Sequence, residues 1–191
     1  NPSTQTVNDS YYKRAVEIGK AVSRSSKSVP FVGHSLAGGL ASAAQGASGG
    51  TAGNPASTYN AAGLHSNTVA KYAGSGASAD AGKINAIRVD GEVLTKAQES
   101  DLIRMAIPKA VGMTRNLKPS LSKAQYRDGQ GRFDKQAAAQ MGQEYDEDDA
   151  YSTQLHSMDE VIGAMEAQKQ ANQTALEFCA ANKHDFLDLG F

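Results

Sequence analysis

The sequence has a single cysteine, no surplus of charge and no long apolar run, and each absence narrows what the protein can be. Because Cys179 has no second thiol to pair with, the chain cannot close an intramolecular disulfide, and a metal site built on thiolates is disfavoured. The 19 Lys and Arg residues are balanced by 20 Asp and Glu residues, so the net charge of -1 does not favour nucleic acid as a partner. No apolar run approaches the length of a membrane span, and the N-terminus lacks the basic and then apolar layout of a signal peptide.

What is present is the pattern of one α/β domain over residues 1–191, a length that can bury a real core. Short apolar or alternating runs predict three strands, at residues 29–32, 55–60 and 84–89. Helical spacing predicts helices at residues 11–22, 36–45, 66–72, 95–105 and 157–182. We interpret residues 1–10 as a polar, turn-rich lead and residues 112–135 as a mixed loop. Strand, turn and helix units in this order predict a mainly parallel sheet flanked by helices.

The sharpest chemical signal lies around Ser35, where the apolar run at residues 29–32 gives way to a small-residue helix. A nucleophile elbow needs a strand that ends abruptly, a serine at a strained tip and a helix that leaves at once. It also needs small residues two positions before and two after the serine, and Gly33 and Ala37 stand there. Such an elbow exposes the Ser35 hydroxyl and points the Leu36 N–H at a developing oxyanion. A loop rich in Gly and Ser can fit the bare motif by chance, but the strand before it and the helix after it favour the elbow.

Residues 33–43 (GHSLAGGLASA) and 58–64 (TYNAAGL) resemble the class 3 lipases. They are more closely similar to the lipase and phospholipase domains of bacterial effectors, toxins delivered by contact-dependent secretion systems. Three further pieces follow in the order of that family, at residues 91–95 (GEVLT), 108–112 (PKAVG) and 155–162 (LHSMDEVI). The resemblance spans roughly residues 11–165. It implies an α/β-hydrolase fold, of which this chain is the C-terminal part with the nucleophile elbow.

Four histidines compete for the role of the base that takes the serine proton. In α/β hydrolases the triad follows the chain order Ser, acid, His. His34 lies inside the elbow with its side chain away from the oxyanion, His65 precedes any plausible acid, and His184 lies in a charged tail. His156 has the right order and resembles the His-x-Met motif of the family, so we expect it to be the base.

Asp90 and Glu92 both follow the strand at residues 84–89, where α/β hydrolases carry the acid. The resemblance of residues 91–95 to the family favours Glu92 and leaves Asp90 in reserve, since Asp90-Gly91 is also a good turn pair. We therefore expect Ser35, Glu92 and His156 to form the triad.

No metal or other cofactor is expected. Residues 144–149 and 128–134 are acidic enough to suggest calcium, but neither has the spacing of a known calcium loop. A solvated acidic surface is the better interpretation of both segments.

These assignments predict a serine lipase or phospholipase that works through an acyl-enzyme, with a lipid ester, membrane phospholipid above all, as substrate. A carboxylesterase of small esters and a non-catalytic interaction module that retains the fold are the alternatives. The effector resemblance implies a protein that is secreted or delivered into a target cell, with an immunity or inhibitor protein as a partner.

Three observations predict a contribution from outside residues 1–191. Three strands are few for a stable parallel sheet, and the second oxyanion donor of this fold comes from a loop after an earlier strand. The chain also begins at Asn1 rather than at a methionine. We expect upstream residues or a second chain to supply a strand beside residues 29–32 and to complete the oxyanion hole.

Overall fold

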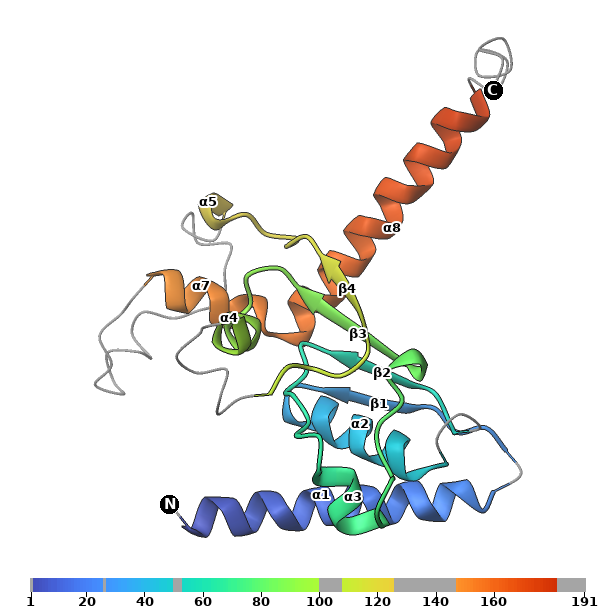
Figure 1. Cartoon of the computed structure of the whole chain (residues 1–191). Coiled ribbons are helices and arrows are strands. Elements are labelled where there is room, and N and C mark those ends of the chain that lie inside the picture. Colours follow the sequence, from blue (N-terminus) through green and yellow to red (C-terminus); the bar gives the residue numbers. More distant parts are fainter. Residues whose placement is uncertain (1, 26, 50–52, 100–107, 126–146, 182–191) are drawn as a thin grey trace.

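One parallel four-stranded sheet organises the protein. The computed structural model describes residues 2–25, 27–49, 53–99, 108–125 and 147–181. The sheet contains β1 (Phe31–His34), β2 (Ala56–Tyr59), β3 (Ile84–Val89) and β4 (Met113–Leu117). Its strands lie in the order β1-β2-β3-β4, and every neighbouring pair is parallel (Figure 1). A crossover connection therefore joins each strand to the next one along the chain. The expected parallel α/β architecture is confirmed at this level.

One face of the sheet is covered by three helices: α1 (Pro2–Ser23), α2 (Leu36–Ala47) and α3 (Thr68–Ala73). Small residues line the buried side of α2, which lets α1 approach closely. A Cβ at Gly19 would lie 2.2 Å from the backbone oxygen of Ala44. Val16, Ala43 and Val69 form the centre of the core on this face.

The opposite face carries a second core under α7 (Glu147–Leu155) and α8 (Met158–Ala181). Side chains alternate between the two faces of a strand, so Ile87 and Val89 of β3 point to the same face, where Leu155 and Val161 cover them. Beyond its first two turns α8 leaves the sheet, and its residues 165–177 are exposed (Figure 1). Three short helices complete the described structure: η2 (Ala81–Lys83), α4 (Val93–Glu99) and α5 (Lys123–Gln125).

The fourth strand corrects the interpretation of residues 112–135 as a loop. β4 has almost no apolar alternation, and Met113 to Asn116 are exposed. Its register with β3, from Asn85↔Met113 to Val89↔Leu117, holds it in the sheet through the backbone instead. A strand held mainly by main-chain pairing at a sheet edge leaves little hydrophobic signal in the sequence.

Helices also begin at other points than the sequence suggested. Residues 2–10 were expected as a turn-rich lead, but they belong to α1, because a helix that is already packed gains one hydrogen bond for each residue it adds. The acidic segment at 144–149 enters α7 at Glu147, while residues 144–146 and the segment 128–134 lie outside the described residues. The helix expected over 95–105 begins at Val93, and its part beyond Glu99 is likewise outside them.

Candidate active site

Ser35 occupies a sharp turn between β1 and α2. Its backbone has φ 55° and ψ -127°, a conformation that non-glycine residues rarely adopt and that stores strain. Two hydrogen bonds hold it in place: the Ser35 N–H donates to Tyr59 O at 3.1 Å, and the Ala62 N–H donates to Ser35 O at 2.8 Å. The end of β2 and the segment after it therefore hold both backbone polar groups of the serine.

Two glycines make this turn sterically possible. A Cβ at Gly33 would lie 2.1 Å from Ala37 O, and a Cβ at Gly38 would lie 2.4 Å from Ala61 Cβ. Both distances are far below van der Waals contact, so β1, α2 and the segment after β2 meet only because these side chains are absent. Ala37 is tolerated two positions after the serine because its backbone oxygen approaches Gly33 and its methyl group does not.

His156 lies in the short turn between α7 and α8 and reaches both other residues singled out by the sequence. Its Nε2 is 2.9 Å from Ser35 Oγ, and its Nδ1 is 2.6 Å from Glu92 Oε2. These contacts join positions 121 and 64 residues apart in the chain. With Nδ1 donating to the carboxylate, Nε2 is left free to accept the serine proton.

Glu92 is the buried member of the group, with a side chain only 1% exposed. It precedes the first residue of α4, and its carboxylate accepts the N–H groups of Leu94, at 2.9 Å, and of Thr95. Burial alone would raise the pKa of Glu92, but hydrogen bonds from His156, Thr95 and Leu94 outweigh it and hold that pKa below its ordinary value. The carboxylate therefore stays ionised beside the imidazole at neutral pH.

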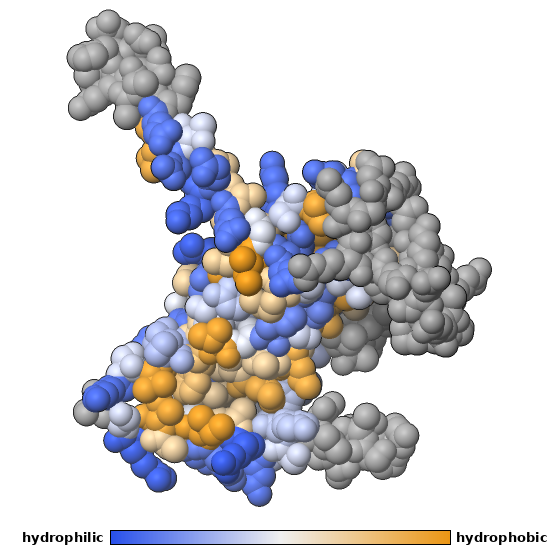
Figure 2. Space-filling view, turned by 180° about the vertical axis from the view of Figure 1, so that it is seen from behind, coloured by the Kyte–Doolittle hydropathy of each residue, from blue (hydrophilic) through white to orange (hydrophobic). Residues whose placement is uncertain are grey.

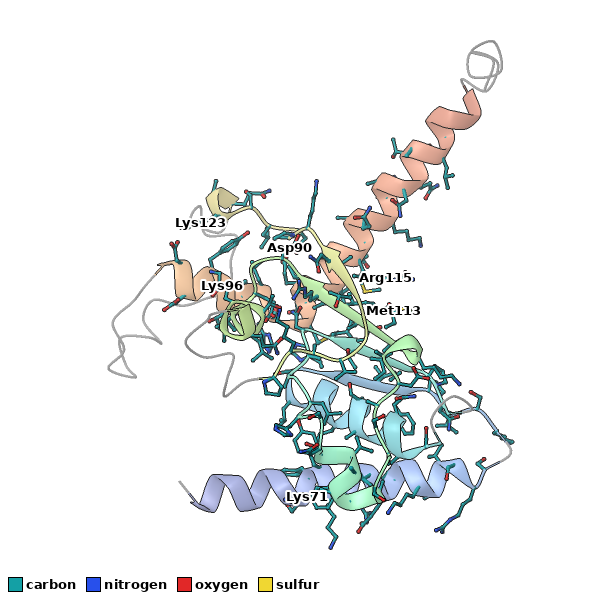
Figure 3. All side chains as sticks on the ribbon, in the orientation of Figure 1. Lys71, Asp90, Lys96, Met113, Arg115 and Lys123 are labelled. Carbon is teal, nitrogen blue, oxygen red and sulfur yellow. The ribbon has the colours of Figure 1, made fainter. Side chains whose placement is uncertain are left out.

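The remaining candidates lie elsewhere. Asp90 is exposed in the turn after β3 (Figure 3), and the carboxylate that contacts His156 is that of Glu92. His65 is exposed after β2, where its Nδ1 accepts the Asn67 N–H at 3.3 Å. His184 lies outside the described residues. Leu36 is the first residue of α2, so its N–H has no acceptor one turn earlier in the helix.

Two residues contact the His156 turn that sequence reasoning did not connect with it. His34 Nε2 lies 2.7 Å from His156 O, and Asn60 Nδ2 lies 3.2 Å from the same oxygen. The sequence places His34 inside the elbow, away from the oxyanion, and suggests no role for Asn60. A weak signal existed for Asn60, because Asn at a strand end tolerates the positive φ that this turn requires.

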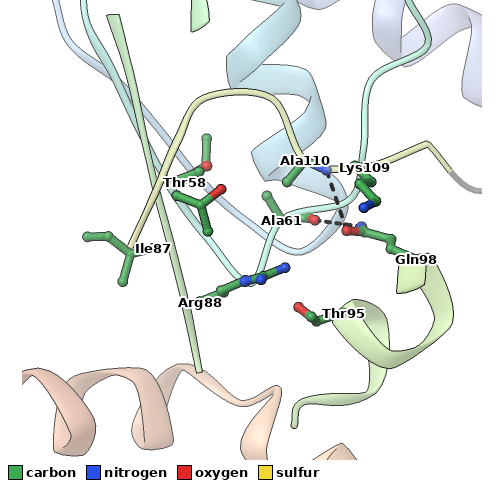
Figure 4. Close-up of a pocket in the computed structure, with 10 residues that line it drawn as sticks. Thr58, Ala61, Ile87, Arg88, Thr95, Gln98, Lys109 and Ala110 are labelled. Carbon is green, nitrogen blue, oxygen red and sulfur yellow. Dashed lines mark hydrogen bonds between the residues drawn. The ribbon is translucent and has the colours of Figure 1, made fainter. Parts of the chain in front are cut away.

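Described residues line two cavities against the sheet, and Ser35, Glu92 and His156 are not among the lining residues of either. One of about 170 Å³ lies between the sheet and α4 (Figure 4), where Gln98 bonds Ala61 O at 3.0 Å and the Ala110 N–H at 3.4 Å. The other, about 460 Å³, is a mainly apolar groove between the second sheet face and α8. Met113 and Arg115 project from β4 at this side of the molecule (Figure 3).

Within the described ranges, no three His, Cys, Asp or Glu side chains gather in a way that could hold a metal ion. No helix in the same part of the chain has the length and apolar character needed to cross a membrane.

Comparison with models of protein families gives a match. A family model described as "Phospholipase-like: Tle-like phospholipase domain" matches residues 3–131, which is 129 of the 191 residues. The matched region contains Ser35 and Glu92 and ends before His156. No curated protein matches the chain.

Proposed function

The chain belongs to the Tle-like phospholipase domain family, and from this premise we propose that it is a serine hydrolase of the α/β-hydrolase fold that cleaves phospholipid esters. Family membership supports lipid hydrolysis. The observation that carries the serine mechanism is the continuous series of hydrogen bonds from Ser35 through His156 to Glu92. A strained serine at a strand-to-helix turn, with an imidazole and a buried carboxylate behind it, is the arrangement that acyl transfer requires.

The chemistry follows from these positions. His156 Nε2 takes the Ser35 proton as Oγ attacks the ester carbonyl, and the Leu36 N–H stabilises the negative charge on the tetrahedral oxygen. The imidazolium formed is stabilised by the ionised Glu92 and then gives its proton to the departing alcohol. Water repeats the sequence on the acyl-enzyme and releases a fatty acid, with Ser35 restored.

Ser35→Ala is the direct test. The change removes one oxygen from a turn that is otherwise packed through glycine and backbone contacts, so the fold should persist while ester cleavage stops. Mass spectrometry of mixed bacterial phospholipids after incubation with either protein measures the loss, and a fluorophosphonate probe reports labelling of the serine. Equal labelling of the Ser35→Ala protein would refute the assignment, and cleavage of small esters alone would favour a carboxylesterase.

We also propose that the protein acts as a secreted or delivered effector on membrane phospholipid and is opposed by an immunity or inhibitor protein. Membership in a family of effector-type phospholipase domains supports this proposal. Expression in the cytoplasm and in the periplasm of a bacterium, with Ser35→Ala as the control in each compartment, tests it. Growth arrest that is equal with and without the serine would contradict it.

Another proposal concerns the open edge of the sheet and the second oxyanion donor. Phe31 and Ser35 donate their N–H groups to β2, so the intervening amides of Val32 and His34 point away from it. In the described part of the chain, β1 has β2 as its strand neighbour and an open edge on the other side. We propose that a strand from outside residues 1–191, upstream or in a second chain, pairs with this edge and brings the second oxyanion donor.

A further inference from the structure

We propose that Asn60 is a positioning residue for the hydrolase reaction, because it fixes the turn that carries His156 against the strand end that carries Glu92. The proposal rests on the serine mechanism proposed above. The Asn60 hydrogen bonds all go to backbone groups and to none of the three reacting side chains. It acts through the backbone on which they stand.

The side-chain amide of Asn60 joins the end of β3 to the turn between α7 and α8. Its Nδ2 donates to Leu155 O at 3.0 Å and to His156 O at 3.2 Å, while its Oδ1 accepts the Val89 N–H at 2.9 Å. Val89 is the last residue of β3, three positions before Glu92. The Asn60 amide thus connects the end of β3, which Glu92 follows, to the turn that contains His156.

Asn60 is also held rigidly. Its side chain is fully buried, with 0% exposure, and its backbone has φ 40°, one of two positive-φ non-glycine residues among the described positions. Its own N–H donates to Ile87 O at 2.9 Å. Tyr59, just before it, and Ala62, two positions after it, bond the backbone of Ser35. The segment at residues 59–62 therefore contacts the backbone around all three members of the proposed triad.

His34 gives the His156 turn a second hydrogen-bond donor. Its Nε2 lies 2.7 Å from His156 O, and since a carbonyl only accepts, that nitrogen must carry the proton. The two imidazole rings lie 5.0 Å apart between centroids and are inclined by 39°. The His156 carbonyl thus accepts hydrogen bonds from His34 of β1 and from Asn60 after β2. These two bonds fix the backbone from which the His156 imidazole projects.

The chemistry of the position explains why an asparagine stands there. The site needs two donor hydrogens on one side and an acceptor on the other, within a side chain short enough for a buried turn at positive φ. Asp supplies the acceptor but turns a second oxygen toward two carbonyls. Removing the side chain takes the partner from the buried Val89 N–H, removes a bond from Leu155 O and leaves His156 O bonded to His34 alone, so the turn is freer to shift. Displacements of about 1 Å in a catalytic group cost on the order of a hundredfold in rate.

Two variants separate positioning from folding. Asn60→Gly keeps the positive φ and removes all three side-chain bonds, while Asn60→Asp keeps the shape and the Val89 bond but loses the donors. Gln45 is the matched control. It is a fully buried amide, its Oε1 accepts the Asp80 N–H at 2.9 Å, and it lies in α2 away from the triad. Gln45→Ala and Gln45→Glu should also lower thermal stability, because each alters a buried side chain in the core.

We expect both Asn60 variants to reduce kcat about a hundredfold with KM nearly unchanged, and to slow fluorophosphonate labelling of Ser35 in parallel. The Gln45 variants should keep kcat below their melting temperatures. The histidine pair offers a rescue test, since the His34→Gln amide can still donate to His156 O and should retain far more activity than His34→Ala. The low-field proton resonance of the His156 Nδ1–H should broaden or shift in Asn60→Asp and stay in place in Gln45→Glu.

The outcomes separate this inference from the proposed function. If the parent protein is not labelled at Ser35, the serine mechanism itself fails. If the parent is labelled and an Asn60 variant keeps the parental kcat, or loses no more than its Gln45 counterpart, the positioning role is wrong while the mechanism stands. Should Asn60→Gly not fold, Asn60→Asp alone decides the matter through the same kcat and resonance measurements.

Discussion

At the scale of single residues, the proposed mechanism depends on which carboxylate supports His156. Glu92 is buried, bonded by two backbone N–H groups and 2.6 Å from the imidazole, whereas Asp90 is exposed in the preceding turn. Glu92→Gln keeps the shape of the side chain and removes the charge that stabilises the imidazolium. Kinetics on a phospholipid substrate should show kcat falling by several orders of magnitude for Glu92→Gln and by less than tenfold for Asp90→Asn. The opposite ranking would make Asp90 the acid.

The ionisation of Glu92 also predicts how stability changes with pH. Its pKa in the folded protein lies below the ordinary value of 4.5, so its contribution to stability is complete above that value and is lost as pH falls through the folded-state pKa. The difference in free energy of unfolding between the parent and Glu92→Gln should therefore be constant near neutral pH and should shrink below about pH 4.5. Urea titrations at several pH values measure it. Gln45→Ala, which removes no titrating group, should show a constant difference, and a gap for Glu92→Gln that widens in acid would contradict the assignment.

At the scale of secondary-structure elements, the elbow works because β1, α2 and the segment after β2 meet without side chains between them. Gly33→Ala would place a Cβ 2.1 Å from a backbone oxygen that cannot move without breaking the start of α2. We expect it to cost about 1–3 kcal/mol or more and to abolish activity. Gly82→Ala is the control, because its Cβ would meet only the Asp80 carboxylate, at 3.3 Å. Thermal unfolding and fluorophosphonate labelling measure both, and equal stability of the two variants would show that the turn is more adaptable than its geometry suggests.

The elements also show what the sequence could and could not predict. The elbow was predictable because its strand, glycine, serine and helix follow one another directly in the chain. The local sequence pattern was therefore enough to identify it. The structure places His156 between Ser35 and Glu92, while the catalytic roles that the sequence and the family resemblance suggest for all three stay predictions. β4 was missed because Thr114 and Arg115 are exposed and the strand is held by backbone pairing. Asn60 escaped notice because its importance comes from Val89 and Leu155, which are distant in sequence and adjacent only after folding.

At the scale of the whole molecule, two apolar surfaces stand out. The groove along α8 contains Met165 and Leu176, and Leu176 is 71% exposed. Near the elbow, Val29 and Val32 are exposed as well, with Val32 at 66%. Figure 2 shows apolar surface gathered over the lower half of the molecule, below the projecting α8. Unpaired strand edges with exposed β-branched side chains readily associate with another strand, so the open edge of β1 is the surface whose occupancy bears most directly on catalysis.

Val32→Pro tests whether that edge is paired in the active protein. The Val32 N–H points away from β2, so proline leaves the β1–β2 register intact while removing the donor and placing its ring toward any additional strand. If a strand from outside residues 1–191 completes the oxyanion hole, Val32→Pro should lower kcat by about a hundredfold to a thousandfold, the usual effect of losing one oxyanion donor.

Val32→Thr is the control, because it changes the side chain to a similar degree and keeps the N–H. The measurement is phospholipid hydrolysis by this chain, alone and co-expressed with its upstream segment: co-expression should raise the activity of the parent and of Val32→Thr but not that of Val32→Pro. Full activity of Val32→Pro, or no response of the parent to co-expression, would show that β1 functions as a true edge and that the second donor comes from within residues 1–191.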